Sequence, residues 1–190
     1  MKISISYNKK SIDNAIQTIE NAKKQLYGVM INELLVECCN EIIRLANEKL
    51  DLTDIGSNVK TDIQSSWTFE PPIDKKIRLV NTAEKAVYVE FGVGIVGQQD
   101  PHPNAAQEGY EYNVPSPSKR ADNSWKFATQ VENLDLPNKD VRKYETEDNN
   151  IVVFTKGTAA TMFVYQSIMD FKDFGLAKKI WKNIKKKYWG

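Results

Sequence analysis

The chain has 190 residues, of which 41% are hydrophobic and 27% charged, and its formal net charge is +1. This composition is that of an ordinary globular protein and excludes a chain that is disordered throughout. No run approaches the ~20 apolar residues of a membrane-spanning helix, and residues 1–7 alternate like a strand without the apolar centre of a secretory signal. We therefore expect one substantial domain with extensions that folds in the cytosol.

The charges and the two cysteines narrow the class of protein further. Residues 171–190 carry seven lysines and one aspartate, net +6, so residues 1–170 carry 19 basic and 24 acidic side chains, net −5. Cys38 and Cys39 are adjacent within a helical pattern, where successive side chains point about 100° apart, so we expect no disulfide between them. With a single histidine in the chain they do not make a zinc site, and we expect one core thiol and one thiol at its flank.

A long amphipathic helix is predicted over residues 11–50. Ser11 is a candidate N-cap, and Gly56 is a candidate stop. One continuous helix would be roughly 60 Å long at ~1.5 Å per residue, which exceeds a compact domain of this size. We favour a break near Gly28, and the alternative is a helix that projects and packs on another subunit. The apolar positions recur at spacings of three, four and seven: Ile12, Ile16, Ile19, Leu26, Met30, Leu34, Cys38, Ile42 and Leu45.

A small antiparallel sheet and a helical turn follow. Residues 59–70 begin as a short helical or extended segment and run into a strand, which Pro71 and Pro72 end because proline lacks the donor that a strand interior needs. Residues 76–81 make a second strand that pairs with the first. A helical turn is then predicted across residues 83–89.

Residues 94–124 are the least core-like part of the chain. Four of the seven prolines fall here, and a loop of about 30 residues without an element of its own is uncommon in a compact domain. Tyr110 and Tyr112 supply rigid contact area that a linker does not need. We interpret the segment as an interaction loop that orders on assembly, with a flexible insertion as the alternative.

Core-like sequence resumes at Trp125. Strands are predicted at residues 125–128 and 151–154, with a surface connection over 132–150. Helices are predicted over residues 158–171, with Thr158 as a candidate cap, and over 176–188. The elements together predict an α+β fold with a long N-terminal helix, a small, mostly antiparallel sheet, C-terminal helices and a long polar insertion loop. We place a single domain at residues 1–174 and a basic C-terminal helix at 175–190.

Few residues offer catalytic chemistry. Glu90 lies in an apolar run and could act as a general base, but we favour a structural carboxylate that caps backbone donors or pairs with a cation, within the subunit or at an interface. His102 lies between two prolines and is expected to be a solvated loop residue. Gly92 and Gly94 resemble half of a dinucleotide-binding loop, yet we expect no third glycine at the required spacing, no helix that opens after them and therefore no phosphate cradle. We therefore predict no enzyme, no cofactor and no metal site.

The last predicted helix is basic and amphipathic. Three interpretations stay open: a solvated face above a docked apolar stripe, a contact with the backbone of a nucleic acid, or a contact with an acidic protein or a membrane surface. The lysines of this helix are Lys178, Lys179, Lys182, Lys185, Lys186 and Lys187, and its apolar residues are Ile180, Trp181, Ile184 and Tyr188.

Two motifs and the order of the segments carry a resemblance to a known family. The long N-terminal helix is followed by SSW at residues 65–67, AVYVEFGVG at 86–94, a polar insertion, Trp125, and TKGTAA at 155–160 before a helix. This order resembles the neck or tail-completion family of tailed bacteriophages, the minor tail components that join head and tail. Its members typically carry YVEFGTG and a TKG or TRG turn followed by small residues.

The resemblance covers residues 10–172 and is not complete. Val93 stands where the family usually has a hydroxyl residue, the insertion over 94–124 is long, and the proline-containing phrase that usually follows the turn is missing. The lysine-rich end past Gly175 is not part of the pattern.

The resemblance implies a non-enzymatic structural protein of the virion with an α+β fold. Copies of the chain would form a ring in the neck, between the head connector or stopper and the tail tube or tail terminator, after synthesis in the host cytoplasm and without a membrane partner. The six lysines would face DNA in the channel or an acidic partner, and the alternative function is a basic-tailed nucleic-acid-binding accessory protein of a mobile element. The interface candidates are Tyr88, Glu90, Phe91, Gly92, Gly94, Tyr110 and Tyr112.

Overall fold

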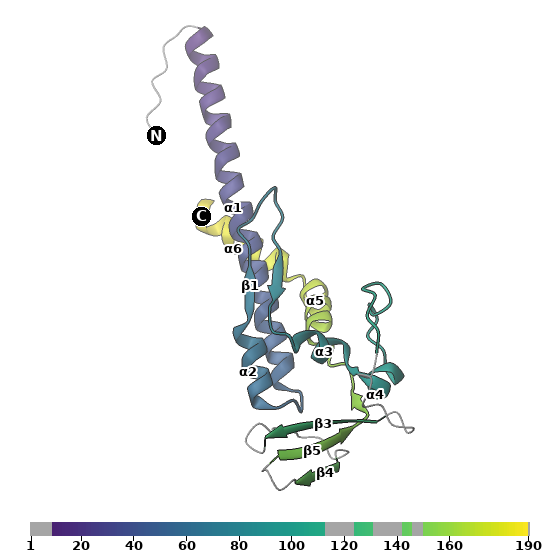
Figure 1. Cartoon of the computed structure of the whole chain (residues 1–190). Coiled ribbons are helices and arrows are strands. Elements are labelled where there is room, and N and C mark those ends of the chain that lie inside the picture. Colours follow the sequence, from purple (N-terminus) through teal and green to yellow (C-terminus); the bar gives the residue numbers. More distant parts are fainter. Residues whose placement is uncertain (1–8, 113–123, 131–141, 146–149, 190) are drawn as a thin grey trace.

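The computed structural model describes residues 9–112, 124–130, 142–145 and 150–189. One long helix runs past the rest of the molecule, and the shorter elements gather around its C-terminal half (Figure 1). The predicted α+β fold is confirmed, with its long N-terminal helix, small antiparallel sheets and C-terminal helices. Of the predicted insertion loop, residues 113–123 lie outside the described residues.

Helix α1 (Lys9–Asp51) is one continuous helix of 43 residues. The predicted break near Gly28 is wrong. A single glycine costs a helix only about 1 kcal/mol, and nothing beyond the local helix backbone lies within 4 Å of the place where its Cβ would stand, so no neighbour forces a bend. The predicted end near residue 50 agrees with the structure, but the predicted cap and stop are wrong, because α1 begins before Ser11 and Gly56 directly precedes the next helix.

A helix and a hairpin follow α1. Helix α2 (Ser57–Ser65) leads into strand β1 (Trp67–Phe69), which pairs antiparallel with β2 (Leu79–Asn81), as predicted. The indole Nε1–H of Trp67 donates to Asn47 Oδ1 of α1 at 3.0 Å and so ties the hairpin to the long helix.

Two short helices come next. Helix α3 (Ala86–Phe91) confirms the helical turn predicted across 83–89, displaced by a few residues. Helix α4 (Gly94–Gln99) opens almost directly after it. The expectation that residues 94–124 have no element of their own is therefore wrong.

A second sheet contains strands β3 (Trp125–Gln130), β4 (Arg142–Glu145) and β5 (Asn150–Thr155), in the order β3-β5-β4 and antiparallel throughout. The predicted strands at 125–128 and 151–154 are confirmed. Strand β4 and the first residue of β5 fall in the segment 132–150 predicted as a surface connection, so that prediction is wrong there, and its other residues, 132–141 and 146–149, lie outside the described residues. The sequence of β4, RKYE, lacks an alternating apolar pattern, which an edge strand does not need.

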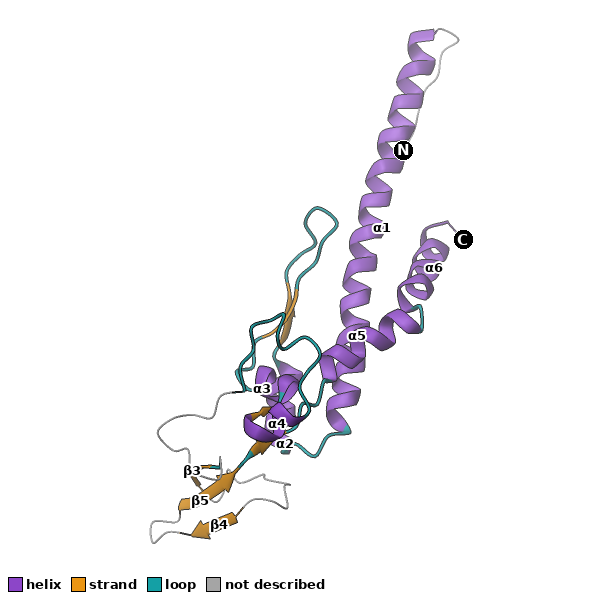
Figure 2. Ribbon diagram, turned by 90° about the vertical axis from the view of Figure 1, so that its right-hand side faces the viewer, coloured by secondary structure: helices purple, strands orange, loops and turns teal. Residues whose placement is uncertain are grey.

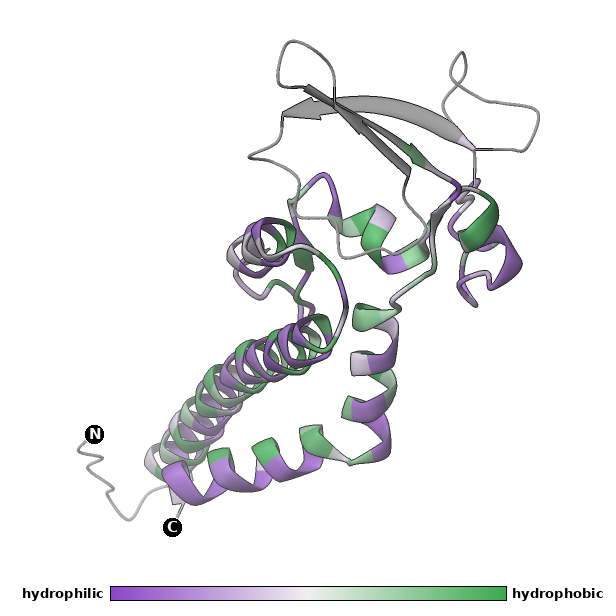
Figure 3. Ribbon diagram, turned by 90° about the horizontal axis from the view of Figure 1, so that it is seen from below, coloured by the Kyte–Doolittle hydropathy of each residue, from purple (hydrophilic) through white to green (hydrophobic). Residues whose placement is uncertain are grey.

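Two C-terminal helices pack along α1. After strand β6 (Gly157–Thr158), helix α5 (Phe163–Asp173) begins five residues beyond Thr158, so the predicted cap is wrong. Helix α6 (Leu176–Trp189) confirms the last predicted helix. Figure 3 shows hydrophobic and hydrophilic residues alternating along it, as an amphipathic docking helix requires. An ion pair between Lys49 and Asp170 at 2.6 Å joins α1 to α5.

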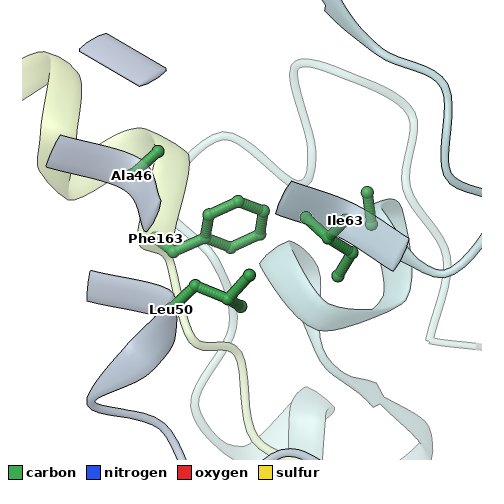
Figure 4. Close-up of a cluster of buried hydrophobic side chains, with 5 residues drawn as sticks. Ala46, Leu50, Ile63 and Phe163 are labelled. Carbon is green, nitrogen blue, oxygen red and sulfur yellow. The ribbon is translucent and has the colours of Figure 1, made fainter. Parts of the chain in front are cut away.

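The main core lies where four helices meet at the C-terminal end of α1. Phe163 of α5 is the largest of its fully buried side chains and points between α1 and α2 (Figure 4). Since the cluster includes a residue of α3, burying it fixes α3 against α5. The members of the cluster are Ala46, Leu50, Ile63, Ala86 and Phe163.

Candidate interaction site

The two sequence motifs meet in space. Val93 pairs with Thr158, and Gly94 pairs with Gly157, as isolated antiparallel bridges. Two further backbone hydrogen bonds, of 3.0 and 3.1 Å, join the same two segments. We call this contact between residues 89–94 and 157–162 the crossing.

Glycines make the crossing geometrically feasible. A Cβ on Gly157 would stand 1.8 Å from the Val93 carbonyl oxygen, and its φ of +112° already disfavours any other residue. A Cβ on Gly92, with φ +78°, would stand 2.6 Å from the backbone nitrogen of Ala160. Both motifs therefore need glycine for the same reason, the close approach of one backbone to the other.

Glu90 caps helix α5 across the crossing. Its Oε2 accepts the Val164 N–H at 2.8 Å, and its Oε1 accepts the Tyr165 N–H at 2.9 Å. These two amides belong to the first turn of α5, whose own N-cap residue Met162 makes no side-chain cap. Free amides and the positive end of the helix dipole favour a carboxylate there. The predicted role of Glu90 as a carboxylate that caps backbone donors is confirmed.

His102 is buried and bonded to Glu90, so the prediction of a solvated loop histidine is wrong. Its Nε2 lies 3.0 Å from Glu90 Oε1, and its Nδ1 accepts the Asn104 N–H at 3.1 Å. Because Nδ1 is an acceptor, we assign the proton to Nε2, which donates to the carboxylate. The ring lies between Phe91 and Tyr165, with centroids 4.3 and 5.2 Å away.

Two tyrosines fold the start of the insertion back onto this cluster. Tyr110 donates its hydroxyl proton to the Gly92 carbonyl at 2.6 Å and stacks on Phe91. Tyr112 Oη accepts the backbone N–H of His102 at 2.8 Å. Burial raises the pKa of the Tyr110 hydroxyl, which is consistent with its use as a donor. The prolines beside His102 therefore belong to a packed segment rather than a free loop.

The glycines at the start of α4 lie in a setting unlike a phosphate cradle. Gly92, Gly94 and Gly97 together have the spacing G-x-G-x-x-G, and a helix does open at Gly94, so the expectation of half a motif without a helix is wrong. A dinucleotide loop follows a strand of a parallel sheet, whereas these glycines follow helix α3. A Cβ at Gly97 would meet the Gly92 backbone at 2.9 Å, so this glycine too serves close packing.

Most of the candidate interface residues are buried or half-buried by contacts within the subunit. Gly92 and Gly94 are buried, Glu90 is 8% exposed, and Phe91 and the two tyrosines are half-buried. Only Tyr88 is largely exposed, at 53%, and it stands beside Val87, which is 43% exposed. The outer face of α3 is therefore what this site offers to a partner.

The basic helix has the form of a docked stripe below solvated lysines. Ile184 is buried in this helix, which packs on α1 and α5, while Lys178, Lys179, Lys182, Lys185 and Lys186 are exposed. Lys187 is exposed too but donates to Glu33 of α1 at 2.8 Å, as does the Tyr188 hydroxyl. These two hydrogen bonds hold the pKa of Glu33 below its ordinary value.

Tyr165, Thr161 and Asn104 complete the cluster and were not anticipated. Thr161 donates its hydroxyl to the Val89 carbonyl at 2.8 Å. No spacing in the sequence links these three residues to Glu90. The sequence signals near them are the TKGTAA turn, which directly precedes Thr161, and the proline-rich segment 94–124, which contains Asn104.

Other site classes and the comparisons with known proteins add no candidate. Among the described ranges, no three His, Cys, Asp or Glu side chains gather to hold a metal ion. Within the same part of the chain, no helix has the length and apolar character needed to cross a membrane. No protein-family model, curated protein or solved structure matches the chain significantly.

Proposed function

We propose that this chain is a structural protein of a tailed-bacteriophage virion, a neck or tail-completion protein that joins the head connector to the tail through ring assembly. The observation that carries the proposal is the crossing. The motifs at residues 88–94 and 155–160, on which the resemblance to this family rests, lie far apart in the sequence and bridge each other directly. Because the two motifs contact each other, they act as one structural unit, and the resemblance rests on more than two unrelated short patterns.

The chemistry of the crossing suits a structural joint between segments better than a reaction site. The Glu90 carboxylate accepts three hydrogen bonds, and each of them ties one segment of the chain to another. Directly beside it, Val87 and Tyr88 are exposed on α3. Tyrosine supplies a large, rigid contact surface at low entropic cost, so this face is the proposed contact with a connector or tail protein.

Reconstitution tests the proposal. The purified chain is mixed with the connector, stopper and tail-tube proteins encoded beside it, and the masses of the complexes are measured by light scattering. We expect ring-sized complexes, which Val87→Ser/Tyr88→Ser weakens and the matched exposed change Glu84→Ala leaves intact. A strict monomer that binds none of these proteins would contradict the proposal.

The second candidate is a nucleic-acid-binding accessory protein of a mobile element, which the exposed lysines of α6 favour. Phosphate contacts by lysine make binding fall steeply with salt. Fluorescence anisotropy with labelled duplex DNA at several salt concentrations distinguishes the two functions. Salt-dependent binding that is lost on changing Lys178, Lys182, Lys185 and Lys186 to Gln would favour this candidate, and absence of binding would remove it.

A further inference from the structure

The N-terminal half of α1 carries an apolar stripe that no described part of the chain covers. The C-terminal end of α6 lies beside Tyr27, whose ring meets Trp189 edge-on with centroids 5.3 Å apart. In Figures 1 and 2, the part of α1 before this point extends away from every other described element. No described element runs beside this part of the helix, although Ala15 within it is only 6% exposed.

The stripe continues a face that is packed further along the same helix. At about 100° per residue, Ile12, Ile16 and Ile19 all point within about 40° of the direction of Met30. Met30 is fully buried, whereas the three isoleucines are 43%, 51% and 52% exposed. Isoleucine is a poorer helix former than lysine, glutamine or glutamate, so a helix that only faces solvent has no use for it at these positions. The pattern points to a partner that is absent from the single chain.

We propose that this stripe binds the same stripe of α1 in a second copy of the chain. Its residues follow the alternating spacing of three and four that lets two helices wind around each other. Alanine alternates with larger residues along the first part of the stripe, so a large side chain of one copy can fit against a small one of the other. We call the residues at this spacing the seam: Ile12, Ala15, Ile19, Ala22, Leu26 and Val29. Ile12, Ile19 and Val29 are exposed, Ala22 and Leu26 are half-buried, Ala15 is buried, and the exposed Ile16 lies at the flank of the seam.

The charges favour a second copy over a nucleic acid or a membrane. Of the positions that flank the seam, Ser11, Ile16, Thr18, Lys23 and Gln25, only one is charged, so two copies meet without facing rows of like charge. The polar side of the same segment mixes signs, with Asp13 and Glu20 among Lys10 and Lys24. A phosphate backbone or an anionic bilayer would instead reward a uniformly basic face.

The seam would supply a contact between copies of the chain in the ring proposed above. The inference rests on the proposed function only in that both require copies of the chain to meet. Self-association through the seam without binding to connector or tail proteins would keep the inference and overturn the proposed function. A chain that is monomeric alone but forms ring-sized complexes with those proteins would overturn the inference and keep the proposed function.

Sedimentation equilibrium of the full-length chain tests the seam. We expect the wild type to self-associate. The double change Ile12→Gln/Ile19→Gln should raise the dissociation constant at least tenfold, because two apolar contacts per copy are lost. Glutamine favours a helix at least as well as isoleucine, so far-UV circular dichroism should show α1 intact. The matched control Leu52→Gln/Ile73→Gln changes two exposed apolar residues outside the seam and should associate as the wild type does.

Cross-linking between copies locates the contact. Isotopically light and heavy chains are mixed and treated with an amine-reactive reagent, and we expect light-to-heavy links among Lys10, Lys23 and Lys24 that disappear in the seam variant. Three results would overturn the inference: a monomeric wild type, a seam variant that associates with unchanged affinity, or intermolecular links confined to other lysines.

Discussion

Glu90 offers the most direct test of the crossing. Replacing it with alanine leaves two α5 amides without their cap, which typically costs about 1–2 kcal/mol. The same change leaves the buried Nε2–H of His102 without an acceptor, which costs about a further 1–3 kcal/mol. We therefore expect Glu90→Ala to lower the free energy of unfolding by about 2–5 kcal/mol.

Urea denaturation followed by circular dichroism and tryptophan fluorescence measures this loss. Glu90→Gln keeps the shape and one acceptor oxygen, so its loss should be about half as large. Glu84→Ala, an exposed change near the start of α3, should stay within about 0.5 kcal/mol of the wild type. The reasoning would be refuted if Glu90→Ala were as stable as Glu84→Ala, or if amide exchange at Val164 and Tyr165 did not accelerate.

Three further predictions follow from packing and charge. Gly157→Ala should prevent folding or lower the free energy of unfolding by more than about 3 kcal/mol, since the new Cβ would overlap the Val93 carbonyl. Gly28→Ala, in open space on α1, should raise the free energy of unfolding by up to about 1 kcal/mol. Equal urea midpoints for the two variants would contradict this. Phe163→Ala should cost about 3–5 kcal/mol in the same assay because it empties the core, and a loss below about 1 kcal/mol would show that the cluster is not packed as described. Lys187 and Tyr188 lower the pKa of Glu33, so the stability that the ionised Glu33 contributes is present above its ordinary pKa and is lost as pH falls through the lowered value. Glu33→Gln should therefore make the stability of the protein less sensitive to acid below about pH 4.5. An unchanged midpoint of acid unfolding would contradict the pairing.

Local patterns were sufficient for much of the secondary structure. Periodicity predicted the long helix, the β1–β2 pair, strands at 125–128 and 151–154 and the final helix, because each of these elements shows its own spacing. The break near Gly28 was wrong because it assumed that a helix must fit within a compact body, whereas α1 projects. Strand β4 has no apolar alternation in its sequence, and it is extended because it pairs with β5.

The Glu90 cluster is held by contacts between distant residues, which the spacing of residues along the sequence does not predict. The sequence favoured a structural role for Glu90, either capping backbone donors or pairing with a cation, but the target of the cap, the first turn of α5, lies more than 70 residues away. His102 looked exposed because of its prolines, yet Glu90 and Tyr112 hold it from other parts of the chain. The motif glycines were visible, but the reason for them is the approach of a second backbone, which only the fold reveals.

Quantitative mass spectrometry of purified virions tests the central claim most directly. If the proposed function holds, a phage or prophage encodes this chain, and its particles would be purified with the connector protein as the internal reference. The proposed function predicts that the chain is present in a fixed ratio to the connector and remains with particles whose heads and tails are joined. Its absence from purified particles, while the connector and tail tube are detected, would contradict the proposal.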